Sequence, residues 1–232
     1  MELWGICGLE NYQNMAYGLK QVFLTKLMQT LCEFLPPIVF LAGWIFASDW
    51  LIDVLYLFYF GRILFPAICG VSLYRMGKEI GTCKKAAALC FVDVAALVIR
   101  FIVHADLIGD VTYIMYFGAE EGISMYDEYL EGAAAWIDLI AGIGHCVAPL
   151  LAVYFVCTSV AAVMKELGAD EIAKFGKVVW VTNLVMSILY MIVSFLPSLI
   201  RTDGGRIALF VAYVLYLRFL HASYRVLEEQ DK

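Results

Sequence analysis

Long apolar stretches separated by short polar clusters dominate the pattern of this chain. A transmembrane helix takes about 20 mostly apolar residues, because the hydrocarbon is about 30 Å thick and a helix rises about 1.5 Å per residue. Stretches of about that length lie at residues 31–48, 51–74, 86–104, 135–161, 178–199 and 206–224. The pattern predicts an all-α, polytopic membrane bundle of about six transmembrane helices.

A more polar stretch precedes the first apolar segment. Between Tyr17 and Thr30, Leu19, Val22 and Leu27 recur at helical spacing among lysines and glutamines, which favours an amphipathic elbow helix at the membrane interface. No basic region followed by an apolar run opens the chain, so we expect no cleavable signal peptide. We therefore expect a cytoplasmic or interfacial segment 1–30, a six-helix domain 31–224 and a short cytoplasmic tail 225–232.

Basic residues gather on one side of the predicted membrane. Lys and Arg in short loops resist translocation, so the side that is richer in them faces the cytoplasm. With the N-terminus inside, that side holds Lys20, Lys26, Arg75, Lys78, Lys84, Lys85, Lys165, Lys174, Lys177, Arg225 and Lys232, and the outer loops hold Arg201 and Arg206. We expect both termini in the cytoplasm, with the chain in the plasma (inner) membrane.

The long outer loop 105–135 combines acidic and aromatic residues. It carries no Lys or Arg, and its acids are Asp106, Asp110, Glu120, Glu121, Asp127, Glu128 and Glu131. Interleaved tyrosines favour a lid lying against the headgroups, where amphipathic rings are stable. The alternative is a vestibule that concentrates cations or docks a basic partner. The sequence leaves both readings open.

Composition narrows the function classes. The chain is 63% hydrophobic and 16% charged, with a formal net charge of -6, and an acidic chain lacks the basic face that nucleic acid requires. The seven cysteines form no CxxC pair and no metal-ligand spacing. Nucleotide-binding, HExxH and GxSxG motifs are also missing, so we expect no catalytic residues, no metal and no cofactor.

Ionisable residues inside the apolar segments are the most informative feature. Each costs about 2.5–3.5 kcal/mol to insert, so such residues face the bundle interior and find partners. From their depths we expect Arg218 to pair with Asp93 or Glu33, and an outer ion pair between Arg100 and Asp138. The candidates for binding or for lining a pathway are Arg62, His145, Glu33, Asp93, Arg218 and the uncharged Asn183.

Arg62 has no acid at its expected depth, which marks it as a candidate for binding an anionic group or bordering a wet cavity. The alternatives are backbone carbonyls freed by Pro66, or an acid displaced by helix tilt. His145 can titrate near neutral pH and carry protons, although a lone histidine is more often a hydrogen-bonded core residue. Kinks or interruptions are expected at Pro36, Pro37, Pro66 and Pro149.

A weak internal repeat accompanies these residues. Gly61-Arg62 and Gly144-His145 are each followed by three apolar residues and a proline, and Lys26, Lys85 and Lys177 each precede a polar residue by six to eight positions. Three tandem two-helix units would produce this pattern, as would chance resemblance among apolar segments.

A transporter or channel-like permease, moving a small solute or ion along a polar route between kinked helices, explains the buried polar residues best. The alternative is a membrane subunit or sensor that docks a soluble or membrane partner, with the cytoplasmic loops 75–85 and 164–177 as contact surfaces. An intramembrane enzyme is the third class, and no motif supports it. The expected partners are therefore the lipid bilayer, a small solute or ion, and a cytoplasmic protein at those two loops.

Overall fold

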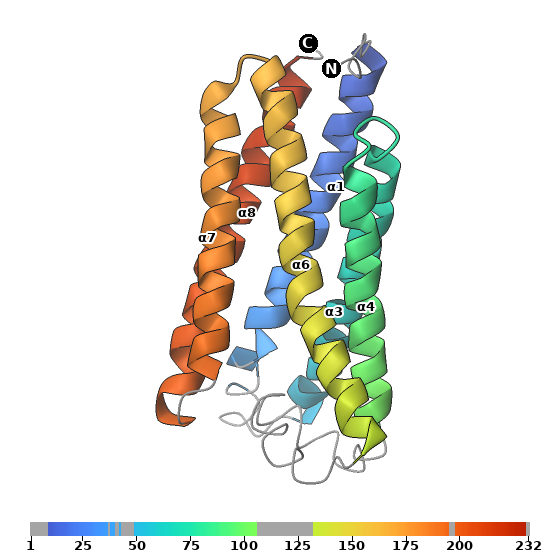
Figure 1. Ribbon diagram of the computed structural model, residues 1–232, viewed down its shortest axis with the longest axis vertical. Helices are drawn as coiled ribbons and strands as arrows, with labels where there is room; N and C mark the ends of the chain where they lie inside the picture. Colours follow the sequence, from blue (N-terminus) through green and yellow to red (C-terminus); the bar gives the residue numbers. More distant parts are fainter. Residues whose placement is uncertain are drawn as a thin grey trace.

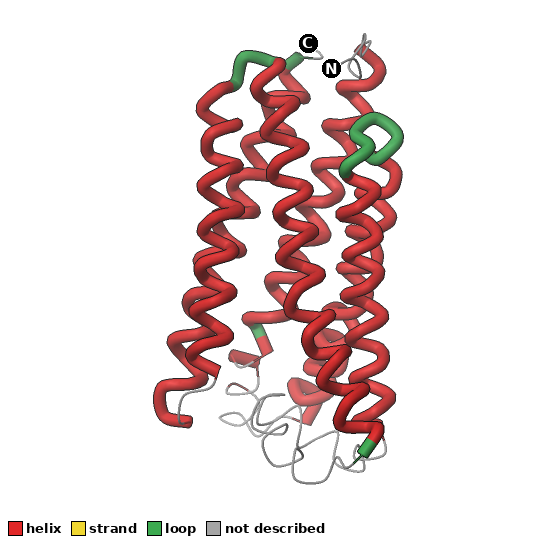
Figure 2. The backbone as a smooth tube through the Cα atoms, in the orientation of Figure 1, coloured by secondary structure: helices red, strands yellow, loops and turns green. Residues whose placement is uncertain are grey.

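Six long helices make up the described part of the chain (Figure 1). The computed structural model describes residues 9–36, 38–39, 42, 49–105, 132–194 and 198–230. Helix accounts for nearly all of these residues, with short loops between the rods (Figure 2). The helices are α1 (Leu9–Phe34), α3 (Asp49–Met76), α4 (Cys83–Ala105), α6 (Ala133–Glu166), α7 (Asp170–Ser194) and α8 (Ser198–Glu229).

The all-α prediction is confirmed. Among the described residues, three stretches are long and apolar enough to cross a membrane by length and composition: Cys83–Val103, Ala133–Glu166 and Asp170–Tyr190. They indicate a membrane protein. Four helices are longer than the apolar segments predicted for them, namely α3, α4, α6 and α8. In each of them the helix continues from the apolar stretch into the polar residues that flank it. The predicted outer loop lies outside the described residues except at its two ends.

α1 differs most from its prediction. The stretch expected as a separate elbow, residues 17–30, lies inside one continuous helix that packs against α3 and α8. Lys26 and Gln29 are buried on this helix, whereas Tyr17 and Leu24 are exposed. Hydropathy missed most of α1, because in the C-terminal half of this helix polar side chains face the other helices while Met28 and Leu31 face outward.

Prolines act differently in the three helices expected to bend. α1 ends at Phe34, directly before Leu35 and Pro36, because a residue that precedes proline disfavours the helical conformation. Pro66 lies inside α3 and Pro149 inside α6, and both helices continue through them. α6 bends along its length (Figure 1). Pro37 lies outside the described residues.

The six helices pack as a closed ring of three hairpins. Each helix contacts its neighbours in the sequence, α8 returns to contact α1, and the ring is flattened enough for α6 to touch α8. Figure 1 shows α6 at the front, α4 and α3 on one side, α7 on the other, and α1 and α8 behind. An ion pair closes the ring between α1 and α8, with Lys20 Nζ 2.9 Å from Glu228 Oε1. The hydrogen bond and charge of Glu228 raise the pKa of Lys20.

The ring has two unlike halves. We call the end where α1 begins and α8 ends the terminal half; it also holds the turns 77–82 and 167–169 (Figure 1). Its core is apolar and includes fully buried Leu19, Leu73, Val156, Phe219 and Leu220.

The other end is the distal half. The buried hydrophobic residues described there are all small, namely Cys32, Ala96, Ala141, Ala148 and Ala212. Small side chains leave room between the helices for polar groups.

Candidate functional site

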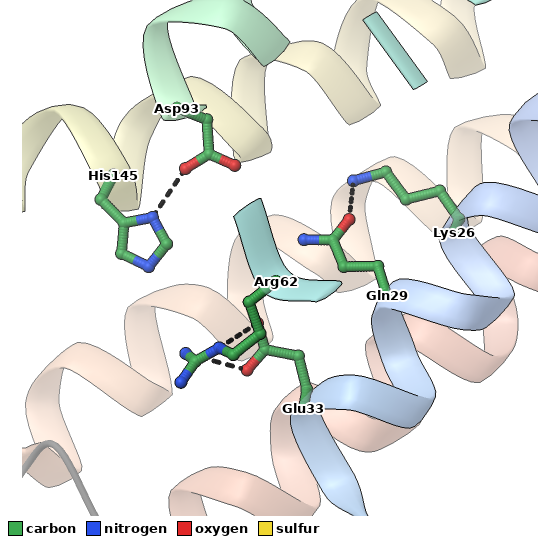
Figure 3. A network of polar contacts seen from close by, with 6 residues as sticks. All are labelled: Lys26, Gln29, Glu33, Arg62, Asp93 and His145. Atoms are coloured by element: carbon green, nitrogen blue, oxygen red, sulfur yellow. Dashed lines mark hydrogen bonds and ion pairs between the residues drawn. The ribbon is translucent and has the colours of Figure 1, made fainter. Parts of the chain in front are cut away.

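Four helices direct polar side chains into one region of the distal half (Figure 3). α1 contributes Lys26, Gln29 and Glu33, α3 contributes Arg62, α4 contributes Asp93 and α6 contributes His145. We call these six side chains the polar cluster. They form three contacts, Lys26 with Gln29, Glu33 with Arg62, and Asp93 with His145.

Glu33 and Arg62 join α1 to α3 through two contacts. The Nε of Arg62 lies 3.2 Å from Glu33 Oε1, and its Nη2 lies 3.1 Å from Oε2. A guanidinium and a carboxylate joined at both ends hold each other in a fixed orientation.

The expectation that Arg62 has no acid at its depth is therefore wrong. Glu33 was placed near the cytoplasmic side because the first span was expected to begin at residue 31. In the structure α1 begins at Leu9, which puts Glu33 near the far end of that helix, level with Arg62.

Asp93 and His145 join α4 to α6. The Nδ1 of His145 lies 2.6 Å from Asp93 Oδ1, and the Asp93 side chain is 3% exposed, against 26% for His145. The contact uses Nδ1 of the ring, whose role as donor or acceptor depends on the tautomer, and Nε2 lies on the side of the ring away from the Asp93 carboxylate (Figure 3).

Arg100 and Asp138 form the ion pair expected from their depths. The Nε of Arg100 lies 3.0 Å from Asp138 Oδ1. Arg100 follows Asp93 by two turns of α4, so both side chains project from one face of that helix. The α4–α6 hairpin therefore carries two polar contacts, with the Arg100 pair closer to the distal end.

Asn183 joins α7 to α8 and is buried. Its Nδ2 donates to the Val179 carbonyl at 3.0 Å and to the Ala212 carbonyl at 3.3 Å. The third hairpin thus has an uncharged contact where the other two have an acid facing a base.

The predicted pairing of Arg218 with Asp93 or Glu33 is wrong. Arg218 contacts neither Asp93 nor Glu33, and its guanidinium lies 5.7 Å from the centre of the Phe175 ring. Arg218 is exposed whereas the adjacent Phe219 and Leu220 are buried, so it projects from the outer side of α8. Its position near the C-terminal end of α8 also keeps it far from Glu33.

Sequence reasoning missed Lys26 and Gln29. Lys26 was counted among the cytoplasmic basic residues because it precedes the first apolar segment. The signal that could have found both is their spacing, since Lys26, Gln29 and Glu33 follow one another by three and four residues and so share one face of a helix. Among the described residues, no group of His, Cys, Asp and Glu could hold a metal ion.

Comparison with known protein families, with curated proteins and with solved structures finds no match for this chain. What the site can do is therefore inferred from its own residues, which are two acid–base pairs and a buried lysine.

Proposed function

We propose that this chain is an integral membrane permease or channel-like protein that moves a small solute or ion along a polar route inside the helix ring. The observation that carries the proposal is the polar cluster itself, which gathers ionisable side chains from four helices in one region (Figure 3). Ionised groups in a bilayer are costly and mark solute or ion pathways when they face the interior. The side chains of Arg62 and His145 remain 32% and 26% exposed, which supports contact with water or solute.

Six spans are part of the proposal. Every helix has at least 23 residues, or about 35 Å at 1.5 Å per residue, enough to cross a bilayer. Each also exposes large apolar side chains, which suits contact with lipid. Examples are Leu24 on α1, Leu57 and Phe60 on α3, Ile102 on α4, Ile140 on α6, Val178 on α7 and Phe210 on α8.

The proposed orientation places both termini in the cytoplasm of a plasma (inner) membrane. The terminal half carries the exposed basic residues Arg75, Lys78, Lys84, Lys85, Lys165, Lys174, Lys177 and Arg225. Such an excess of Lys and Arg is typical of cytoplasmic ends. The distal half, with the polar cluster, then faces the outer side.

Three tandem hairpins are the proposed plan of the ring. Glu33 and Arg62 are 29 positions apart, and Asn183 and Ala212 are also 29 positions apart. Asp93 and His145 make the corresponding contact in the middle hairpin, whose helices are separated by the long outer loop. This equivalence supports an axis along the membrane normal, as in transporters built from parallel repeats.

The apolar terminal half is the proposed barrier of the route. Fully buried Leu19, Leu73, Val156, Phe219 and Leu220 fill the ring there, and a tightly packed apolar layer excludes water and ions. A solute would reach the polar cluster from the distal side, and passage would require the helices of the terminal half to separate.

Flux into proteoliposomes tests the proposal. Purified chain is reconstituted, and uptake of radiolabelled sodium, chloride, methanesulfonate and tetramethylammonium is compared with protein-free vesicles. We expect Arg62→Leu to abolish the flux that the wild-type chain supports, with folding checked by circular dichroism and gel filtration. Arg75→Leu, at the exposed end of the same helix, is the matched control and keeps the flux. Unchanged flux in Arg62→Leu would remove Arg62 from the route.

A further inference from the structure

Lys26 is a buried cation whose hydrogen bond goes to a neutral group. It lies on α1 about 25 Å along the axis from Leu9, at about 1.5 Å per residue, and it is 6% exposed. Its Nζ donates to Gln29 Oε1 at 2.8 Å. An ammonium has three donors, and among the described residues that amide oxygen is the acceptor that Nζ reaches.

The two nearby carboxylates are engaged with other bases. Cys69, Cys90, Asp93 and Glu33 are the groups that act on the Lys26 charge through space. Of the two acids among them, Glu33 is held at both oxygens by Arg62, and Asp93 is hydrogen-bonded to His145. Lys26 forms no ion pair with a described acid. Figure 3 shows its Nζ pointing into the region that it shares with Asp93.

The charge of the polar cluster depends on one proton. With His145 neutral, the positive Lys26 and Arg62 balance the negative Glu33 and Asp93. With His145 protonated, the Asp93–His145 and Glu33–Arg62 pairs are each neutral. Lys26 then carries a net positive charge in a region of low dielectric constant, where such a charge attracts a counterion strongly.

We propose that Lys26 is the anion-binding residue of the route and takes a small monovalent anion of the carboxylate or sulfonate class, together with a proton on Nε2 of His145. The inference rests on the proposed function for its transport role, whereas its binding step stands on Lys26 alone. The anion oxygens accept the free donors of Nζ, and the proton keeps the loaded site neutral. A cation is disfavoured, because both carboxylates already have partners and two basic side chains face the same region.

Binding is tested on the full chain in detergent, by its thermal unfolding. Sodium gluconate, whose anion is large, is exchanged for sodium methanesulfonate at constant ionic strength, at about pH 5.5 and at about pH 8, on either side of the usual histidine range. We expect methanesulfonate to raise the unfolding temperature of the wild-type chain, with tighter binding at the lower pH. His145→Asn removes that pH dependence.

Substitutions at Lys26 separate binding from a structural role. We expect Lys26→Met to raise the half-saturating methanesulfonate concentration about tenfold or more, because a charge-assisted hydrogen bond is lost. Lys26→Arg keeps the response, and the control Lys20→Met, at an exposed position of α1, leaves it unchanged. In gluconate at about pH 5.5, Lys26→Met unfolds at or above the wild-type temperature, because it removes a buried charge that the cluster does not balance when His145 is protonated.

Two results would overturn the inference. One is equal stabilisation of the wild-type chain and Lys26→Met by methanesulfonate, or no stabilisation of either. The other is a lowered unfolding temperature of Lys26→Met in gluconate at about pH 5.5, which would make Lys26 a structural partner of Asp93.

Flux separates this inference from the proposed function. If the wild-type chain takes up sodium or tetramethylammonium but not methanesulfonate, the permease stands and the anion is excluded as its transported solute. Stabilisation by methanesulfonate that depends on Lys26, without flux of any probe, would keep the anion site and exclude the permease.

Discussion

The two ends of α6 show how one ring of helices supports two different interiors. In the distal half its buried residues include Asp138, Ala141 and Ala148, whereas in the terminal half they include Val156, Val160 and Met164. The helix is continuous and the ring has the same six members throughout. Side-chain size and polarity at the inward positions decide whether the interior is a packed apolar layer or a space for ionised groups.

Removing a large side chain from the terminal half should have the largest effect on stability. Phe219→Ala is expected to lower the free energy of unfolding by about 3–5 kcal/mol, because it leaves a cavity in a layer that cannot collapse fully. Denaturant unfolding in detergent measures this loss. The matched control on the same helix is Phe210→Ala, whose side chain is 46% exposed and whose loss costs less. Equal losses would contradict the contrast between a packed interior and a lipid-facing surface.

Adding a single methyl group at a crowded and at an open glycine should have the next largest effect. A Cβ at Gly176 would lie 2.8 Å from Cε2 of Phe219, whereas a Cβ at Gly142 meets no atom within 4 Å. Gly176→Ala is therefore expected to destabilise the chain by about 1–3 kcal/mol through overpacking. Gly142→Ala is neutral or slightly stabilising, because alanine favours helix. Thermal unfolding in detergent compares the two, and similar shifts would contradict the close contact between Gly176 and Phe219.

The Glu33–Arg62 pair should show a coupling of smaller size. Glu33→Gln, Arg62→Gln and the double variant form a cycle in which the double variant is more stable than the sum of the single losses predicts. We expect a coupling free energy of about 1 kcal/mol between the two side chains. This is below the value for a fully buried pair, because water screens side chains that are 22% and 32% exposed. A coupling of zero, measured by unfolding in denaturant, would mean that the two side chains do not interact in solution.

The Lys20–Glu228 pair should have the smallest effect, because Lys20 is exposed at the end of the bundle. The pKa of Lys20 is raised, so its contribution is fully present below the ordinary lysine pKa and is lost only as pH rises through the higher folded-state value. Unfolding temperatures of the wild-type chain and Lys20→Met should therefore run parallel between about pH 6 and about pH 9. A divergence within that window would point to another titrating partner.

Much of the fold could be predicted from hydropathy, and the pairing of polar residues only in part. The apolar stretches around Phe91 and Val153 predicted α4 and α6, because a single apolar run in lipid satisfies its backbone hydrogen bonds internally only as a helix. Arg100 and Asp138 could be paired by depth, since both lie in helices whose limits the pattern predicted well. Glu33 was misplaced because its depth depended on where α1 begins.

Lys26 shows why the rest could not be predicted. A lysine ahead of an apolar segment is usually cytoplasmic, and which side of a helix faces the interior depends on helix packing that a single sequence does not display. The polar face of α1 and the apolar face of a soluble amphipathic helix have the same period, so the pattern alone does not tell which face is buried. The contacts of α1 with α3 and α8 decide it.

Thiol accessibility tests the central claim most directly, namely that the distal half holds a wet polar route and the terminal half a dry barrier. Ala96→Cys and Ala152→Cys are matched, at 5% and 4% exposure, and each is made in a chain whose native cysteines are replaced by alanine. A charged, membrane-impermeant thiol reagent is applied to right-side-out and to inverted vesicles. We predict that the thiol of Ala96→Cys reacts in right-side-out vesicles and that of Ala152→Cys reacts in neither. Equal reactivity of the two thiols, or reaction of Ala152→Cys alone, would contradict the claim.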